Sequence, residues 1–281
     1  MGIFGQNYMK AGPGIAKNAP KKKPFFRFWE IYFRKFWKLA ALNFLTLIAC
    51  LPIVTIGPAI AGMTKVLRNY VLEKNSFILH DFRKGFTENW KKSLPAGLID
   101  VTVFISALCS VQVYTSFAEN AENGGLVWYI LCAVSLSAAF TVFMMNFYFF
   151  PMIVATDLDF RNCIKNSFLL VCLGLKKNII TLLLVAFTVA FTLLSLYIAP
   201  YLVFAVIPFW IISFLGFLIM FNSYPAIQKY VIEPFYKEQG RDNPEYDYLK
   251  PLVEDDSIFT DKGGEEKTVE PEKEKKGKVI S

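Results

Sequence analysis

The sequence predicts an all-α integral membrane protein, and three observations predict it. Of the 281 residues, 54% are hydrophobic and 28 are Phe, which suits a chain exposed to lipid better than a small soluble domain. All 30 Lys and Arg residues fall outside three apolar stretches, at 39–63, 96–155 and 178–225. These stretches are long enough for helices that cross about 30 Å of hydrocarbon. Because a charge at mid-bilayer costs a few kcal/mol, roughly 2.5 or more, membrane residence explains this partition of charge.

Two transmembrane hairpins are predicted in the second and third stretches. Residues 94–117 and 126–150 each have the length of a span, and the turn between them is acidic and free of Lys and Arg. Residues 178–200 and 201–222 form the second pair, divided at Pro200. Because basic loops stay on the cytoplasmic side, both turns are predicted to face outward and both chain termini to lie in the cytoplasm.

The first stretch, 39–63, is predicted to be a broken or re-entrant helical segment. Both of its flanks are strongly basic, so a single crossing would place one basic flank on the wrong side. Its prolines also interrupt the hydrogen-bond ladder of a helix. A segment that enters the membrane and returns fits both observations, and an ordinary single span is the alternative. Four residues of the break are candidate functional or structural residues: Pro52, Thr55, Gly57 and Pro58.

Amphipathic segments connect the apolar stretches. In residues 25–38, aromatic side chains fall in one arc at about 100° per residue and basic side chains in the opposite arc, with Ile31 as the exception. Such a helix suits the headgroup plane, where anionic lipids attract its basic face. In the alternative arrangement, the aromatic face packs on the protein's own spans. Residues 64–92 and 157–175 are predicted to form further inner-face helices.

An internal repeat supports this arrangement. Residues 81–90 resemble residues 159–168, and each copy precedes a lysine pair and an apolar hairpin. Each hairpin ends in an Asn that is soon followed by Pro. Residues 25–58 have the pattern of a truncated first copy. Repeats at matching positions are a recurrent way of building membrane folds, so the copies predict related helical units.

The chain is predicted to have three parts. A basic segment at 1–24 precedes a helical membrane domain at 25–236, and a charged cytoplasmic tail follows at 237–281. The tail has too few apolar residues to offset the entropy lost on ordering, so its composition predicts disorder. Within it, residues 241–249 are interpreted as solvated, with docking on a partner as the alternative.

Asp100 is the one acidic or basic residue inside the predicted spans. An ionisable residue at membrane depth suggests proton coupling or cation binding. However, Asp100 lies only about two turns into its span, where it can also reach the interface or pair with a lysine. Asn146 and Asn222 complete the candidate residues. Together with Asn43 and Gln112, they are expected to make hydrogen bonds between helices.

The sequence shows no catalytic constellation. It contains no phosphate-binding loop, zinc-protease motif or nucleophile elbow, so we expect no enzyme activity and no cofactor or metal site. Basic residues interleaved with spans favour anionic lipid headgroups as partners and disfavour nucleic acid. The only histidine, His80, stands beside Asp81. We interpret the pair as a helix-start feature, because adjacent helical residues do not face each other.

Four sequence blocks occur together in this chain: G-P-G-I at 12–15, P-K-K-K-P-F-F-R-F-W-E-I-Y-F-R-K-F-W-K-L at 20–39, C-L-P-I-V-T-I-G-P-A-I-A-G-M-T-K-V-L-R-N-Y at 50–70 and D-F-R-K-G-F-x-x-N-W-K at 81–91. In combination they resemble the YesL family of bacterial membrane proteins, which is built around a domain of unknown function, number 624. The resemblance covers roughly residues 12–235, and L-P-I-V-T-I-G-P-A is its most specific block. Members often stand beside sugar-uptake and sensor-kinase genes, so the resemblance implies a carbohydrate-uptake setting. It implies no catalytic residues.

The sequence therefore predicts a non-enzymatic protein of the bacterial cell membrane that assists or regulates carbohydrate uptake through protein contacts. Sugar-transporter or sensor-kinase components are the expected protein partners. The alternative is an oligomeric transporter or channel subunit, with a route near residues 39–63 and Asp100. The sequence identifies neither the ligand nor the oligomeric state.

Overall fold

A computed structural model describes residues 23–121 and 125–245. These residues form helices joined by turns, and no strand occurs among them. Four helical runs in this part of the chain are long and apolar enough to cross a membrane: Trp90–Glu119, Leu126–Ala155, Leu175–Ile198 and Ile211–Glu238. The predicted all-α membrane fold is therefore confirmed. The predicted basic segment up to residue 22 and the predicted tail from residue 246 lie outside the described residues.

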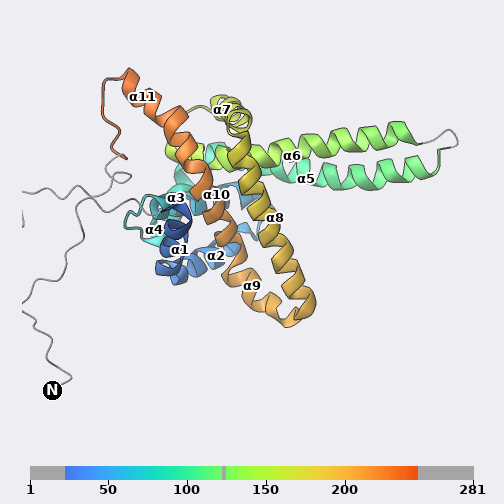
Figure 1. Cartoon of the computed structure of the whole chain (residues 1–281), viewed down its shortest axis with the longest axis horizontal. Helices are drawn as coiled ribbons and strands as arrows, with labels where there is room; N and C mark the ends of the chain where they lie inside the picture. Colours follow the sequence, from blue (N-terminus) through green and yellow to red (C-terminus); the bar gives the residue numbers. More distant parts are fainter. Residues whose placement is uncertain (1–22, 122–124, 246–281) are drawn as a thin grey trace, which may run out of the picture. The chain divides into compact units, whose positions relative to one another are not determined.

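The helices follow one another along the chain as labelled in Figure 1. They are α1 (Pro24–Arg34), α2 (Phe36–Cys50), the 3₁₀ turn η1 (Ile53–Thr55), α3 (Ile56–Val71), α4 (Ile78–Glu88), α5 (Trp90–Glu119), α6 (Leu126–Ala155), α7 (Phe160–Leu173), α8 (Leu175–Ile198), the 3₁₀ turn η2 (Pro200–Leu202), α9 (Val203–Phe209), α10 (Ile211–Ile227), the π-helical turn η3 (Gln228–Ile232) and α11 (Glu233–Glu238).

One pattern occurs three times along the chain: a short helix, a break and then a longer helix. α1 ends before Lys35 and α2 follows, α4 ends before Asn89 and α5 follows, and α7 ends before Gly174 and α8 follows. The sequence repeat at 81–90 and 159–168 therefore falls mainly on α4 and α7, each of which leads into a long apolar helix. In Figure 1, the α5–α6 pair runs in a different direction from α8 and α10. The outward orientation of the two hairpins remains a prediction.

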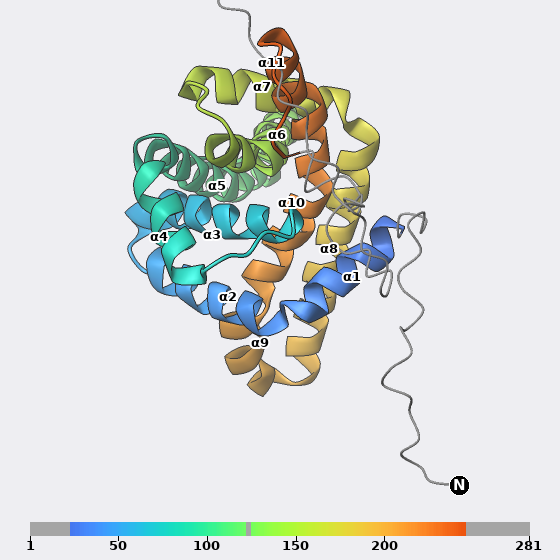
Figure 2. The same ribbon diagram turned by 90° about the vertical axis from the view of Figure 1, so that its left-hand side faces the viewer.

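Helix α3 is the central element of the membrane domain. It contacts α2, α4, α5, α6 and α10, and Figure 2 shows it between α2 and α5. A Cβ atom on Gly57 would lie 1.9 Å from the carbonyl oxygen of Ser93 in α5, and one on Gly97 would lie 2.5 Å from the backbone nitrogen of Gly57. The backbones of α3 and α5 can approach this closely only because both positions are glycine.

The opposite face of α3 uses glycine in the same way. A Cβ atom on Gly62 would lie 2.8 Å from the carbonyl oxygen of Phe82 in α4. In turn, a Cβ atom on Gly85 of α4 would lie 2.8 Å from the Cβ of Lys65. Helix α3 is therefore packed at van der Waals distance on two faces, and its side chains, including Ala59 and Leu67, are buried.

The apolar stretch at 39–63 is broken between α2 and α3. The Thr55 hydroxyl donates to the carbonyl oxygens of Ala49 (2.6 Å) and Pro52 (2.8 Å), which supplies partners for backbone groups near the end of α2. The 15 residues of α2 extend about 22 Å, less than the roughly 30 Å of hydrocarbon that a span must cross. Leu51 and Ile53 at the break are exposed, at 79% and 63%. The break therefore presents apolar side chains at its tip.

A second break separates α9 from α10, and Asn43 of α2 bridges it. The Asn43 side-chain nitrogen donates to the carbonyl oxygens of Ile207 (2.8 Å) and Pro208 (2.7 Å). Its side-chain oxygen accepts from the backbone N–H of Ser213 (2.8 Å). Asn43 is fully buried, so its amide replaces hydrogen bonds that the interrupted helix cannot make internally. The predicted interhelical hydrogen bond of Asn43 is confirmed.

The fourth predicted span, 201–222, requires correction. The chain forms η2 and α9 over its first part, and an unbroken apolar run begins only at Ile211. Pro208 lies next to the break and lacks a backbone donor, which weakens the helix there. Pro225 does not end α10, because the helix continues to Ile227 and then widens into the π turn. The span therefore starts and ends later than the apolar pattern predicted.

Helix α1 buries part of its aromatic face on α10. The Phe28 ring lies 5.0 Å from the Phe217 ring, and the Tyr32 ring lies 5.2 Å from the Phe214 ring, measured between centroids. Ile31, the exception to the predicted pattern, is only 1% exposed. The exposed aromatic side chains of the predicted segment 25–38 are Phe25, Phe26 and Phe33 in α1 and Phe36 and Trp37 in α2, because the chain breaks at Lys35. The alternative of packing on the protein's own spans thus holds for one edge of the helix, and the other edge is free for lipid.

Two ion pairs attach the polar side of α1 to the end of α3. Arg34 and Arg27 donate to the Glu73 carboxylate at 2.6 and 3.2 Å. Burial by itself would raise the pKa of Glu73, but hydrogen bonds from Arg34 and Arg27 outweigh it and lower the pKa below its usual value. Because these groups are partly exposed, each pair contributes at most about 1 kcal/mol.

Gly57→Ala is expected to destabilise the protein by about 1–3 kcal/mol, because the added methyl group forces α3 away from α5. Thermal unfolding of the purified protein in detergent would show a lower Tm. Ala138→Val, which adds bulk on an exposed face of α6, serves as the control and should leave Tm unchanged. Equal Tm values for Gly57→Ala and the wild type would contradict the role assigned to close backbone packing.

Asn43→Leu is expected to lower the free energy of unfolding by about 3 kcal/mol or more, because three backbone groups lose their partner at roughly 1–3 kcal/mol each. Gln112→Leu is the matched control, since it removes an exposed amide from α5. Unfolding of both variants in the same detergent would be compared. A loss of the same size in both variants would refute the bridging role of Asn43.

Candidate functional site

The four candidate residues of the first break lie at the start of α3. Thr55 makes the two hydrogen bonds described above, and Gly57 provides the contact with α5. Pro58 is buried in the first turn of α3, where a missing backbone donor is tolerated. Pro52 is exposed in the break itself. The structure therefore gives three of these residues a capping or packing role and places the fourth at the exposed tip.

Two of the remaining candidates are brought together. The Asn146 side-chain nitrogen of α6 donates to the Asp100 carboxylate of α5 at 2.9 Å, and both residues are half-buried. This hydrogen bond gives the acid a polar partner in a largely apolar hairpin, which offsets part of its desolvation cost. Among the described residues, Asn222 lies half-buried on α10 and makes no hydrogen bond to this pair.

A polar cluster that no sequence motif indicates lies at the end of α3. The Glu245 carboxylate accepts hydrogen bonds from the Arg68 guanidinium, the Tyr224 hydroxyl and the Gln228 amide. The Nε of Arg68 also donates to the Tyr224 hydroxyl at 2.7 Å. Asn243 donates to the Gln228 side-chain oxygen at 3.0 Å and accepts from the backbone N–H of Glu245 at 2.9 Å. The cluster thus joins α3, α10, η3 and the segment that follows α11.

The groups of this cluster are largely shielded from solvent, so their charges interact strongly with one another. Asn243 and Glu245 are 4% and 6% exposed. Burial alone would lower the pKa of Arg68, but its interactions with Tyr224 and Glu245 outweigh it and raise the pKa above its usual value. The interpretation of residues 241–249 as solvated is therefore wrong for Asn243 and Glu245, and residues 246–249 lie outside the described part. The segment docks on the chain itself, which composition could not reveal.

A cavity of about 680 Å³ adjoins the cluster. It is lined by the ends of α3 and α6, the α6–α7 connection, α7, η3, α11 and the segment after α11. Polar lining residues from these elements include Arg68, Asp157, Asn166, Tyr236 and Glu245. The positive-inside rule assigns three basic segments to one face of the membrane: 64–95, 156–177 and 226–245. Each of them contributes residues to this cavity. A cavity of this size, lined by both apolar and polar side chains, has room for a small ligand.

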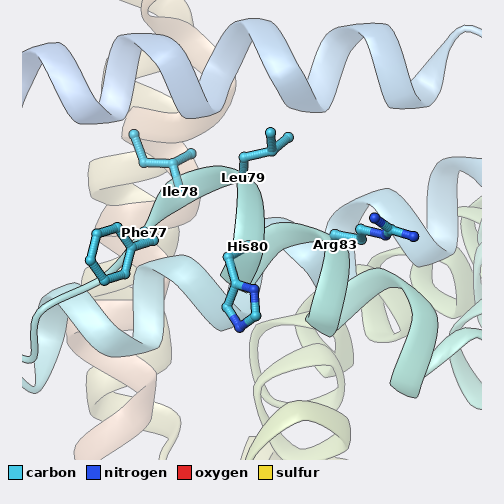
Figure 3. A pocket seen from close by; sticks show the side chains of 5 residues that line it. All are labelled: Phe77, Ile78, Leu79, His80 and Arg83. Atoms are coloured by element: carbon cyan, nitrogen blue, oxygen red, sulfur yellow. The ribbon is translucent and has the colours of Figure 1, made fainter.

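A second, more open hollow lies at the start of α4, with a volume of about 730 Å³. In Figure 3, Ile78 and Leu79 lie on one side of the first turn of α4, and Phe77 and His80 lie on the other. His80 is exposed. Its neighbour Asp81 accepts hydrogen bonds from Ser76 (2.6 Å) and Asn69 (3.1 Å), which fasten the start of α4 to the end of α3. The helix-start interpretation of this pair is confirmed for Asp81.

The remaining chemistry of the described residues is sparse. Among residues 23–121 and 125–245, no group of three or more His, Cys, Asp or Glu side chains is arranged to hold a metal ion. The candidate functional features are therefore the two helix breaks, the Asp100–Asn146 pair and the Arg68–Glu245 cluster with its cavity.

Residues 39–111 match the family described as "Protein of unknown function, DUF624". The matched region begins in α2, includes α3 and α4 and ends within α5, so it contains the first break, the glycine contacts and Asp100. No curated protein and no solved structure matched the chain in these comparisons. The chain is therefore a multi-pass membrane protein in which residues 39–111 match DUF624, and over these residues its resemblance to the YesL family, which is a DUF624 family, is confirmed.

Proposed function

We propose that this protein is a non-enzymatic accessory or regulatory component of carbohydrate uptake in the bacterial cell membrane, acting through protein contacts on its inner face. The observation that carries the proposal is the convergence of α3, α7, η3 and α11 around one cavity, because these elements hold basic segments expected on the cytoplasmic side. The carbohydrate setting is taken from the YesL resemblance. Sugar-transporter or sensor-kinase components are the proposed partners, and anionic lipid headgroups would border this face.

The surface of α7 supports a role in contacts. One side of this helix is buried, with the side chains of Cys163, Ser167 and Leu170. Another side exposes Phe168 and Leu169. Lys165 is exposed on the same helix. A short amphipathic helix with exposed apolar side chains fits either the headgroup layer or a partner's groove. We assign α7 to the partner surface because it also lines the cavity.

Affinity purification of the tagged full chain from native membranes tests this function. We expect recovery of transporter or sensor-kinase components in near-stoichiometric amount. Phe168→Ala should reduce that recovery, whereas Phe140→Ala should not; Phe168 is 51% exposed on α7 and Phe140 is 49% exposed on α6. Recovery of this chain alone, or as homo-oligomers only, would count decisively against an accessory role.

We also propose that α2 and α3 enter the membrane and return to the cytoplasmic side. Three observations support a re-entrant segment: the basic flanks, the short α2 and the exposed apolar tip at Leu51 and Ile53. In a Cys-free variant, Asn75→Cys should be protected from a membrane-impermeant maleimide on intact cells, and Asn120→Cys should be labelled. Both positions are exposed in the structure. Labelling of Asn75→Cys from outside would favour a single span.

A second candidate function is an oligomeric transporter or channel subunit. It is favoured by the Asp100–Asn146 pair inside the α5–α6 hairpin and by two helix breaks, one between α2 and α3 and one between α9 and α10, the second of which Asn43 bridges. Discontinuous helices at membrane depth form ion and substrate sites in transporters. On this proposal, a route would pass near residues 39–63 and Asp100.

Asp100→Asn separates the two functions. The substitution removes the charge but keeps an oxygen that accepts from Asn146, so Tm should stay near the wild-type value. If Asp100 couples transport, uptake into proteoliposomes should fall about tenfold or more, because a lost charge interaction of at least about 1.4 kcal/mol corresponds to that factor. Glu119→Gln, at the exposed end of the same helix, is the control. Wild-type uptake by Asp100→Asn would exclude a coupling role.

A further inference from the structure

We propose that Arg68, Tyr224 and Gln228 form a carboxylate-binding site whose resident ligand is Glu245, and that residues 241–245 are a latch over the adjoining cavity. The inference concerns contacts within the chain and does not depend on the proposed role in sugar uptake.

The donor set suits a carboxylate. A guanidinium, a phenol hydroxyl and a primary amide all direct their hydrogens at the two oxygens of Glu245. The site is also ordered by its own contacts, since Arg68 Nε donates to the Tyr224 hydroxyl and the Arg68 guanidinium carbon lies 5.6 Å from the centre of the Tyr224 ring. Charge-assisted hydrogen bonds of this kind are stronger than neutral ones.

The backbone at the site has an unusual conformation. The π-helical turn η3 begins at Gln228, and its residues Tyr230, Val231 and Ile232 line the cavity. Single π turns are rare and occur frequently at functional sites. Here the wide turn contributes both a donor to the carboxylate and part of the cavity wall, so the carboxylate site and the cavity are one structural unit.

Among the described residues, two buried side chains, those of Asn243 and Glu245, attach the segment that follows α11. It follows Gly240, which has a φ of +64° and no atom within 4 Å of its added Cβ position, so the chain turns there without packing. Arg241, Asp242 and Pro244 are exposed, whereas Asn243 and Glu245 are buried. Pro244 and Glu245 line the cavity. Two polar side chains therefore hold a short non-helical segment against the membrane domain.

Release of this latch would leave the partly buried Arg68 guanidinium, whose side chain is 19% exposed, without its counter-charge, which is unfavourable. An incoming anion would remove that penalty. A carboxylate is the class of ligand that restores all three hydrogen bonds, so the latch should open most readily when another carboxylate takes the place of Glu245.

Hydrogen exchange of the purified full chain, followed by mass spectrometry, tests the latch. In Glu245→Gln, amides of residues 228–245 should exchange about tenfold faster or more, because a hydrogen bond to a charged group contributes at least that factor. Asp242→Asn, which alters an exposed carboxylate of the same segment, should exchange like the wild type. Wild-type exchange in Glu245→Gln would overturn the proposal. Faster exchange that extended through α5 and α6 would also overturn it, because Glu245 would then be a determinant of folding.

Chemical rescue tests the carboxylate site itself. In Glu245→Ala, added sodium acetate should restore protection to η3 around Gln228, whereas sodium chloride at the same ionic strength should not. In the double variant Arg68→Gln with Glu245→Ala, acetate should have no effect. Equal protection by acetate and chloride would overturn the assignment of a carboxylate site, as would acetate protection that persisted without Arg68.

Discussion

The close approach of α3 to its neighbours is the constraint on which the rest of the membrane domain depends. In lipid, apolar side chains gain nothing from leaving one hydrocarbon environment for another, so helices associate through van der Waals contact and hydrogen bonds. Glycine at Gly57 and Gly97 brings α3 against α5, and Gly62 and Gly85 bring it against α4. A third contact is with α10, where a Cβ on Gly216 would lie 2.9 Å from the Leu67 side chain. The short α3 can therefore form a core although it is too short to span.

The second requirement is that every interrupted backbone segment finds partners. Water is absent at membrane depth, so a free carbonyl or N–H group is costly there. Thr55 caps the first break locally, whereas Asn43 supplies both donors and an acceptor to the second break from a different helix. Each interruption would destabilise an isolated helix; the first is stabilised by a local cap and the second by a side chain of α2.

Charged side chains are accommodated in two ways. Within the described part of the chain, Asp100 has one amide partner and is half-buried, so this polar contact is local to one hairpin. Arg68 and Glu245 form a network with Tyr224 and Gln228, in which removal of one partner strands a buried charge. The network makes the start of the C-terminal segment part of the membrane domain and makes its attachment depend on a small number of polar contacts.

The sequence by itself determined membrane residence, the all-α fold, the interruption near Pro52 and most helix positions, because charge exclusion and proline act locally. It also marked Asp100 and Asn146 as notable, although not as partners. Only the tertiary structure decided where the fourth span begins and ends, since the chain breaks between α9 and α10 and the helix continues past Pro225 into the π turn. It alone paired Asn43 with Ile207 and Arg68 with Glu245, contacts that join residues 164 and 177 positions apart. A linear pattern shows that a polar group needs a partner, but packing of distant elements determines which partner it finds.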